Sequence, residues 1–444
     1  MMEANEQTVE ELSILEGELE SMSAGTSVFQ KLGRSPIYIL ADKSKIEADT
    51  RRQLNALKSH IIMSSVVQEA AMFATAVGAL VAVSSWSTLK YVVCGPAIDS
   101  WTHRTQLSRD LIRFFVFSTS SPLMRTIGRA SHQYWPVLAQ YADPLHADEL
   151  VTELEIPGYP LDPRVLDNAG IWAPQLAETA RLSRDMRMYG ECVYPAGTYN
   201  RSTASTDAVV LYMHGGAYTS GSARQYRSVH LRLARASRLR VYGFSYRLAP
   251  EHQYPVALYD AYAAYTHLLT AGHQPQNIVF AGDSAGGNLA LALWQLTRAP
   301  LRALVLLSPR VDVTSTRDSW AKFAHVDVIG AYSVRDPMAP VYQLLGSASK
   351  TVLEDPFVAP VHGRLAGMPR TLVQLGACEV MRDDIREFVQ RARGLGNHLI
   401  EVQEYEGMFH VFQAALSGTQ HVGEAWDAVG AFIKRCVALT IQNE

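Results

Sequence analysis

Cysteine is scarce in this chain, and its positions follow no pattern. Disulfide-rich domains and zinc sites place cysteines, or cysteines with histidines, at short regular spacings. The four cysteines form no such group: they are Cys94, Cys192, Cys378 and Cys436. We therefore expect free thiols in a reducing compartment, and neither a metal site nor another cofactor.

An excess of charge of either sign is missing as well. The 40 lysines and arginines nearly balance the 43 aspartates and glutamates, which leaves a net charge of −3 without a basic cluster. Surfaces that bind nucleic acid are strongly basic, so nucleic acid is not the expected partner. With 444 residues, 48% of them hydrophobic, the chain can bury a large core, and its length fits two or three domains.

The beginning of the chain lacks basic residues. Its first 20 residues contain seven glutamates and no lysine or arginine. A secretory signal peptide begins with basic residues, so we expect an intracellular protein and not a classically secreted one. Apolar residues at helical spacing predict a short amphipathic helix here, with a frayed acidic arm as the alternative. These residues are Val9, Leu12, Leu15, Leu19 and Met22.

One uncharged run is long. Ala70 to Leu89 gives 20 residues without charge between Glu69 and Lys90. This length just spans a bilayer, but the many alanines, serines and threonines weaken insertion. Three interpretations stay open: a membrane span, which would anchor the protein in a membrane such as the endoplasmic reticulum, a helix on a membrane surface, and a buried helix.

From residue 208 onward, strand-like and helix-like segments alternate. This order predicts an α/β fold with a mostly parallel sheet and helices on both faces. The expected strands cover residues 208–213, 240–246, 277–281, 301–307, 371–375 and 400–405. The expected helices cover residues 254–271, 287–297, 383–395 and 422–439.

A serine lies between two glycines where one of these strands meets a helix. The segment Gly282-Asp283-Ser284-Ala285-Gly286 has the spacing of a nucleophile elbow, in which a sharp strand-to-helix turn exposes the serine. Glycines are needed on both sides because a Cβ atom would clash across so tight a turn. A glycine-rich turn of a nucleotide-binding unit is the competing interpretation, and the strand and helix alone do not separate the two.

A serine hydroxyl is a poor nucleophile until a base removes its proton, and that base is normally histidine. His410 follows a turn directly after the last strand and precedes a helix. In open α/β sheets the ligand site lies at the carboxyl ends of the strands, which places His410 near Ser284. His362 is the alternative base, but it follows no predicted strand.

An oxyanion hole is indicated by His214-Gly215-Gly216, which directly follows the strand at 208–213. Glycines let the backbone approach an acyl carbonyl closely, and backbone N–H groups stabilise the oxyanion that forms. We expect three donors, the N–H groups of Gly215, Gly216 and Ala285.

Taken together, these blocks resemble the hormone-sensitive-lipase branch of the α/β-hydrolases, which includes plant carboxylesterases and fungal steryl-acetate deacetylases. The resemblance covers roughly residues 180–435 and rests on HGGAY at 214–218, YRLAPE at 246–251, GDSAGGNLA at 282–290, MRDD at 381–384 and YEGMFHVF at 405–412. It implies the α/β-hydrolase fold with an N-terminal helical cap. Three regions follow: an N-terminal extension at 1–94, the cap at 95–185 and the catalytic domain at 186–444.

The resemblance also bears on the acid of the triad. Members of this branch often carry aspartate three residues before the Arg-Asp-Asp block, where this chain has Glu379. Glutamate serves equally well as an orienting carboxylate. Asp383 and Asp355 are the alternatives, although Asp383 begins a helix, where aspartate is commonly a cap.

Two more positions near the pocket follow from the same resemblance. It assigns Tyr218 to substrate binding. Arg310 stands where tryptophan is common, and it either brings a positive charge near the pocket or pairs with Asp312 or another carboxylate.

The predicted function is a serine carboxylic-ester hydrolase that forms an acyl-enzyme on Ser284. A short-chain or acetyl ester of a hydrophobic alcohol, such as a sterol or another natural product, is the expected substrate. An acyltransferase or cyclisation enzyme of natural-product biosynthesis would use the same triad and remains open. A hydrolase-derived small-molecule receptor is the third hypothesis. The receptor in this branch lacks the triad histidine, whereas this chain has His410. The sequence indicates no oligomeric state.

Overall fold

The computed structural model describes residues 28–31, 38–41, 51, 82–94, 96–117, 145–197, 208–330, 339–346, 349–415 and 418–441. The chain divides into two compact units, Met1–Val77 and Gly78–Glu444. In the first unit, β1 (Val28–Lys31) and β2 (Tyr38–Ala41) pair antiparallel. The amphipathic helix predicted at residues 9–22 lies outside the described residues.

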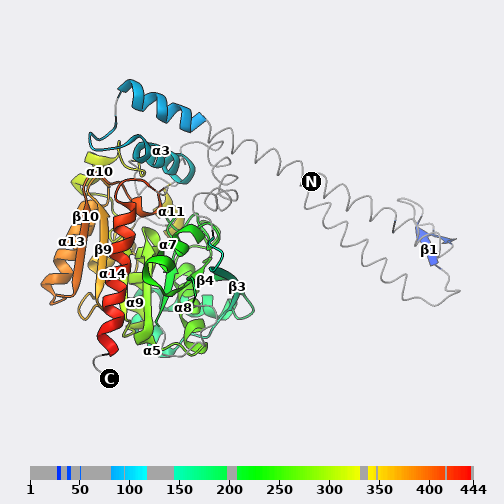
Figure 1. Cartoon of the computed structure of the whole chain (residues 1–444). Coiled ribbons are helices and arrows are strands. Elements are labelled where there is room, and N and C mark those ends of the chain that lie inside the picture. The colour runs from blue at the N-terminus through cyan, green and yellow to red at the C-terminus, as the bar shows by residue number, and fades with distance from the viewer. Residues whose placement is uncertain are drawn as a thin grey trace. The chain divides into compact units, whose positions relative to one another are not determined.

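An eight-stranded sheet organises the second unit (Figure 1). Its strands lie in the order β10-β9-β8-β7-β5-β6-β4-β3. The six from β10 to β6 pair in parallel, β4 pairs antiparallel with β6, and β3 pairs antiparallel with β4. The strands are β3 (Leu150–Pro157), β4 (Arg187–Tyr194), β5 (Val209–Met213), β6 (Arg240–Phe244), β7 (Ile278–Asp283), β8 (Ala303–Leu307), β9 (Thr371–Gly376) and β10 (Ile400–Tyr405).

The central strands are buried and mostly apolar because helices cover both faces of the sheet. Every residue of β5, β7 and β8 is buried, so a short continuous apolar run, and not an alternating one, marks each strand. The predicted α/β fold with a mostly parallel sheet is confirmed, and each of its six predicted strands is present to within two residues at either end.

Helices cover the sheet in two groups. One group pairs α7 (Arg227–Ser237) with α14 (Val422–Ile441), whose backbones approach so closely that a Cβ atom at Gly430 would overlap the Ala236 carbonyl. The other group packs α8 (Val256–Thr270) and α9 (Ala285–Thr297) with α5 (Pro163–Asn168) and α6 (Ala173–Leu182). The remaining helices of the catalytic region are α10 (Asp318–Phe323), α11 (Pro340–Leu345), α12 (Lys350–Leu353) and α13 (Arg382–Gly394).

Two helical segments precede this region, at residues 82–94 and in α3 (His103–Phe117). They lie against each other, since Ser87 Oγ donates to Asp110 Oδ2 at 2.8 Å. The uncharged run Ala70–Leu89 is described only from residue 82. Within the described residues, every helix is too short or too polar to span a bilayer.

The helical cap predicted at residues 95–185 differs from the structure. Residues 150–157 form the edge strand β3 of the main sheet, and α5 and α6 pack on the catalytic helices. The sequence did not mark this strand, because β3 (LVTELEIP) lies at the edge of the sheet and lacks the continuous apolar run of the central strands.

Candidate active site

Ser284 occupies the turn between β7 and α9 in a strained backbone conformation. Its φ of 50° and ψ of −118° are rare for a residue with a Cβ atom. The flanking glycines make the turn possible: a Cβ atom at Gly286 would overlap the Met213 carbonyl, and one at Gly282 would overlap the Gly286 backbone. This is the geometry of a nucleophile elbow.

His410 lies in hydrogen-bonding contact with this serine. The Ser284 Oγ atom is 2.8 Å from His410 Nε2, although the two residues are 126 positions apart. Both side chains are almost completely buried. The imidazole is therefore placed to take the serine proton. The alternative base His362 is exposed on a 3-10 turn (Pro360–His362), away from this contact.

Glu379 lies on the other side of the imidazole. Its Oε2 atom is 3.7 Å from His410 Nδ1 and accepts hydrogen bonds from Ser308 Oγ (2.6 Å) and from Gly376 N (3.2 Å). Among the described residues, neither His410 Nδ1 nor Glu379 Oε1 has a hydrogen-bond partner. These two atoms thus have no competing partners, and the nearer carboxylate oxygen, Oε2, already lies 3.7 Å from Nδ1.

The two alternative acids, Asp383 and Asp355, form their hydrogen bonds with groups other than His410. Asp383 accepts from the Ser319 backbone N–H and pairs with Arg382, and Asp355 accepts from the Trp172 indole. The geometry therefore favours Glu379 as the acid. The hydroxyl of Ser308 also accepts from the Val411 N–H, so it ties the acid to the histidine loop, a role that the sequence reasoning missed.

The glycine turn after β5 requires one correction. The Gly215 N–H donates to Asp283 Oδ1 at 3.0 Å, which takes this group out of the predicted set of oxyanion donors. Within the described part of the chain, no backbone carbonyl accepts a hydrogen bond from the N–H of Gly216 or Ala217. Gly216 and Ala285 stay predicted donors, and Ala217, at a φ of 55°, is the neighbouring candidate.

Asp283 explains why the turn takes this shape. Its buried carboxylate also accepts from the hydroxyls of Tyr212 (2.8 Å) and Tyr226 (3.1 Å). Burial raises the pKa of Asp283 to about 6, and the three donors oppose that rise. A Cβ atom at Gly215 would overlap this carboxylate. The residue before the nucleophile therefore holds the oxyanion turn in place.

Tyr218 and Arg310 have internal partners. The Tyr218 hydroxyl donates to Asn288 Oδ1 at 2.7 Å, and its side chain is buried, so substrate contact by Tyr218 stays a prediction. The Arg310 guanidinium donates to Ser315 Oγ and lies over the Trp320 ring, while its backbone N–H donates to the Ser284 carbonyl at 3.0 Å.

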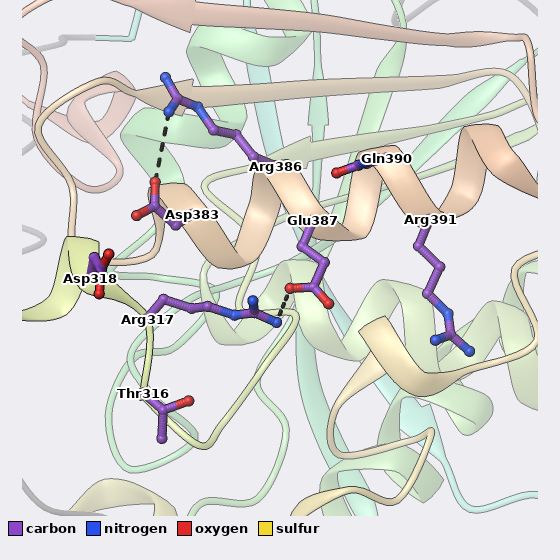
Figure 2. A pocket seen from close by; sticks show the side chains of 8 residues that line it. All are labelled: Thr316, Arg317, Asp318, Asp383, Arg386, Glu387, Gln390 and Arg391. Carbon is purple, nitrogen blue, oxygen red and sulfur yellow. Dashed lines mark ion pairs between the residues drawn. The ribbon is translucent and has the colours of Figure 1, made fainter.

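A hollow on the surface lies beside α13, apart from the triad (Figure 2). Its three arginines are matched by three carboxylates: Arg317 pairs with Glu387, and Arg386 lies 3.7 Å from Asp383. The numbers of positive and negative side chains are equal, so the hollow offers no excess charge to a ligand. No group of three or more metal-ligating side chains occurs among the described residues, and all four cysteines are free.

Comparisons with known proteins agree with this geometry. The profile of a family described as "alpha/beta hydrolase fold" matches residues 210–414. An esterase of Acinetobacter venetianus is 34% identical over 217 residues, which are 48% of this chain and 70% of that protein. An acetyl-hydrolase of Streptomyces hygroscopicus is 32% identical over 254 residues, 56% of this chain and 82% of that protein.

A solved structure extends the likeness to the fold. An esterase from the bacterial hormone-sensitive lipase family superposes with a TM-score of 0.59 at 26% identity, over 76% of this chain and 99% of that one. The prediction of a serine carboxylic-ester hydrolase is confirmed. The chain belongs to the α/β-hydrolases, in the branch that resembles hormone-sensitive lipase.

Proposed function

We propose that this enzyme cleaves short-chain esters, acetyl esters above all, of a hydrophobic alcohol through an acyl-enzyme on Ser284. The observation that carries the assignment of the nucleophile is the 2.8 Å contact between Ser284 Oγ and His410 Nε2. The preference for a short acyl group is supported by the relative named an acetyl-hydrolase.

The reaction follows from the positions of these groups. Ser284 Oγ attacks the ester carbonyl carbon while His410 Nε2 takes its proton, and the Glu379 carboxylate stabilises the imidazolium. Backbone N–H groups at Gly216 and Ala285 bind the oxyanion of the tetrahedral intermediate. His410 returns the proton to the leaving alcohol, and a water molecule, activated by the same imidazole, releases the acid and restores the serine.

Water is the acceptor in this proposal. An acyltransferase or a cyclisation enzyme would use the same acyl-enzyme with another acceptor, but the relatives are named for hydrolysis. A receptor would not need a histidine in contact with the serine. Neither alternative is favoured by an observation in the structure.

A membrane surface is a proposed partner of the segment before the catalytic region. The helix at residues 82–94 leaves four large apolar side chains exposed, Trp86, Leu89, Val92 and Val93, with exposed fractions of 54–75%. Such a face suits the interface of a bilayer, where indole rings are favoured. The exposed side chains support a surface contact for the described part of the run.

Hydrolysis of p-nitrophenyl acetate, butyrate and longer esters, together with steryl acetates, tests the proposed function. We expect the acetyl and butyryl esters to be the best p-nitrophenyl substrates. Replacing Ser284 by alanine should lower kcat by about 10⁴-fold or more, since the nucleophile is lost. A Ser284→Ala protein that hydrolyses these esters at the wild-type rate would refute the assignment.

A further inference from the structure

A second carboxylate is buried next to the triad. Asp327 lies in the loop after α10 and has no exposed surface. It accepts hydrogen bonds from three backbone N–H groups, those of Val328 (2.7 Å), His410 (2.8 Å) and Val380 (2.8 Å). Within the described part of the chain, no lysine or arginine forms an ion pair with its carboxylate.

Two of these three donors belong to the catalytic loops. Oδ1 binds the N–H of His410 itself, and Oδ2 binds the N–H of Val380, the residue directly after Glu379. One rigid side chain therefore joins the loop that carries the acid to the loop that carries the base. A backbone hydrogen bond from Cys378 to Met408 (2.8 Å) joins the same two loops on the other side of Glu379.

The surroundings of Asp327 make it sensitive to charge on the imidazole. Burial raises the pKa of Asp327 to about 6, nearby Glu379 raises it further, and His410 opposes the rise. The other titratable groups that act on it are Cys378 and, from α3, Arg109. A negative charge at this position and a positive charge on His410 therefore stabilise each other.

We propose that Asp327 is a positioning residue of this reaction, a role that rests on the serine mechanism proposed above. It fixes the spacing of the Glu379 and His410 loops through Val380 N and His410 N, and it places a second negative charge beside the imidazolium that forms when Ser284 is deprotonated. The sequence pattern gave no sign of it, because Asp327 lies in an irregular loop at no strand end.

The N-terminal helices support this loop from outside. Arg113 of α3 donates to the carbonyls of His325 (3.2 Å) and Asp327 (3.1 Å). Just before α3, the Trp101 indole donates to the Gly407 carbonyl and packs edge-on against Phe409, at 5.8 Å between ring centroids. The segment at residues 101–113 thus contacts both the Asp327 loop and the histidine loop.

The variant Asp327→Asn tests the proposal because it keeps the size of the side chain and removes its charge. Its amide nitrogen would face a backbone N–H, so one of the loop hydrogen bonds is lost. We expect kcat for p-nitrophenyl acetate to fall by about 10- to 100-fold with KM within about twofold. The acid limb of the pH profile of kcat/KM should move down by about half a unit or more, because the imidazolium loses a stabilising charge.

Asp384→Asn is the matched control. Asp384 is also buried, its pKa is raised to about 7, and it accepts a hydrogen bond from Trp320 away from the triad. Well below the melting temperature, this variant should keep the wild-type kcat and the wild-type acid limb. If Asp327→Asn also keeps both, or if the two variants lower kcat equally without moving the limb, the positioning role is wrong.

Two further measurements keep the test decisive. The rate at which a fluorophosphonate labels Ser284 should fall in Asp327→Asn. This measurement does not require the enzyme to cleave acetyl esters. The proposed substrate and the proposed role of Asp327 can therefore be refuted independently. Should Asp327→Asn not fold, Arg113→Gln loosens the same loop from the surface. We then expect kcat to fall several-fold, and an unchanged labelling rate and kcat would overturn the proposal.

Discussion

At the scale of single residues, the site depends on a few buried polar atoms whose partners are fixed. Ser284 and His410 were predicted from their places at strand ends and Glu379 from the family resemblance, and the structure places the three side chains next to one another. Asp283 and Asp327 were not, because a carboxylate that binds backbone N–H groups leaves no spacing pattern in the sequence. Such roles become visible only when the N–H groups have been placed.

Glu379 has two alternatives in the sequence, Asp383 and Asp355, and a substitution tests it directly. Glu379→Gln should lower kcat by about 10³- to 10⁴-fold, because a neutral amide cannot stabilise the His410 imidazolium. Asp383→Asn, at the alternative acid, should change kcat by less than about threefold. Steady-state kinetics on p-nitrophenyl acetate compares the two variants, and equal losses in both, or a loss only in Asp383→Asn, would contradict the assignment.

At the scale of helices and strands, the central parallel strands were predictable and the antiparallel edge was not. The run VVLYM of β5 is continuous and buried, whereas β3 alternates and is partly exposed at the edge of the sheet. A polar, alternating strand resembles a loop in composition, so its place was decided by pairing with β4 and not by its own residues. For the same reason, the cap predicted at residues 95–185 includes this strand.

The helix at residues 82–94 carries a prediction of its own. Burying one exposed large apolar side chain contributes roughly 1.5–3 kcal/mol of favourable free energy. Two such residues therefore supply a large part of the free energy of a weak surface interaction. Replacing Trp86 and Leu89 together by serine should reduce cosedimentation with phosphatidylcholine–phosphatidylserine vesicles by at least about tenfold. The activity on soluble p-nitrophenyl acetate should stay unchanged.

Leu182→Ser is the matched control for the helix at residues 82–94, since Leu182 is 68% exposed at the end of α6. Its vesicle binding should equal that of the wild type. If the wild-type protein does not bind vesicles, or if the double variant binds as well as Leu182→Ser, no membrane contact is made by this helix.

At the scale of the whole molecule, the strand order assembles the site. The loops after β10, β9, β8, β7 and β5 carry His410, Glu379, Ser308, Ser284 and Gly216, and these strands are consecutive neighbours in the sheet. Parallel strands end at one edge, so residues as far apart in the chain as Gly216 and His410 meet there. The assembled site also contains or adjoins several buried carboxylates, among them Asp283, Asp327 and Asp384, whose charged forms are disfavoured by burial.

These buried carboxylates predict how stability depends on pH. Burial raises the pKa of Asp384 to about 7, above the value of about 4 in an unfolded chain. Between these two values the folded state holds a proton that the unfolded state has released, so this group stabilises the fold at low pH and loses that contribution as pH rises through about 7. Other groups, such as His214 with its lowered pKa, change the free energy of unfolding with pH in the opposite direction. A single variant therefore isolates the contribution of Asp384 better than the pH dependence of wild-type stability does.

Asp384→Asn removes the titration while keeping the shape of the side chain. Relative to the wild type, the variant should gain stability between pH 5 and pH 8, by about 2–4 kcal/mol if the full shift is realised. The cause is that wild-type Asp384 must bury a charge at pH 8 and the asparagine never does. Urea unfolding at both pH values measures the difference, and a stability difference that is the same at pH 5 and pH 8 would show that Asp384 does not titrate in this range.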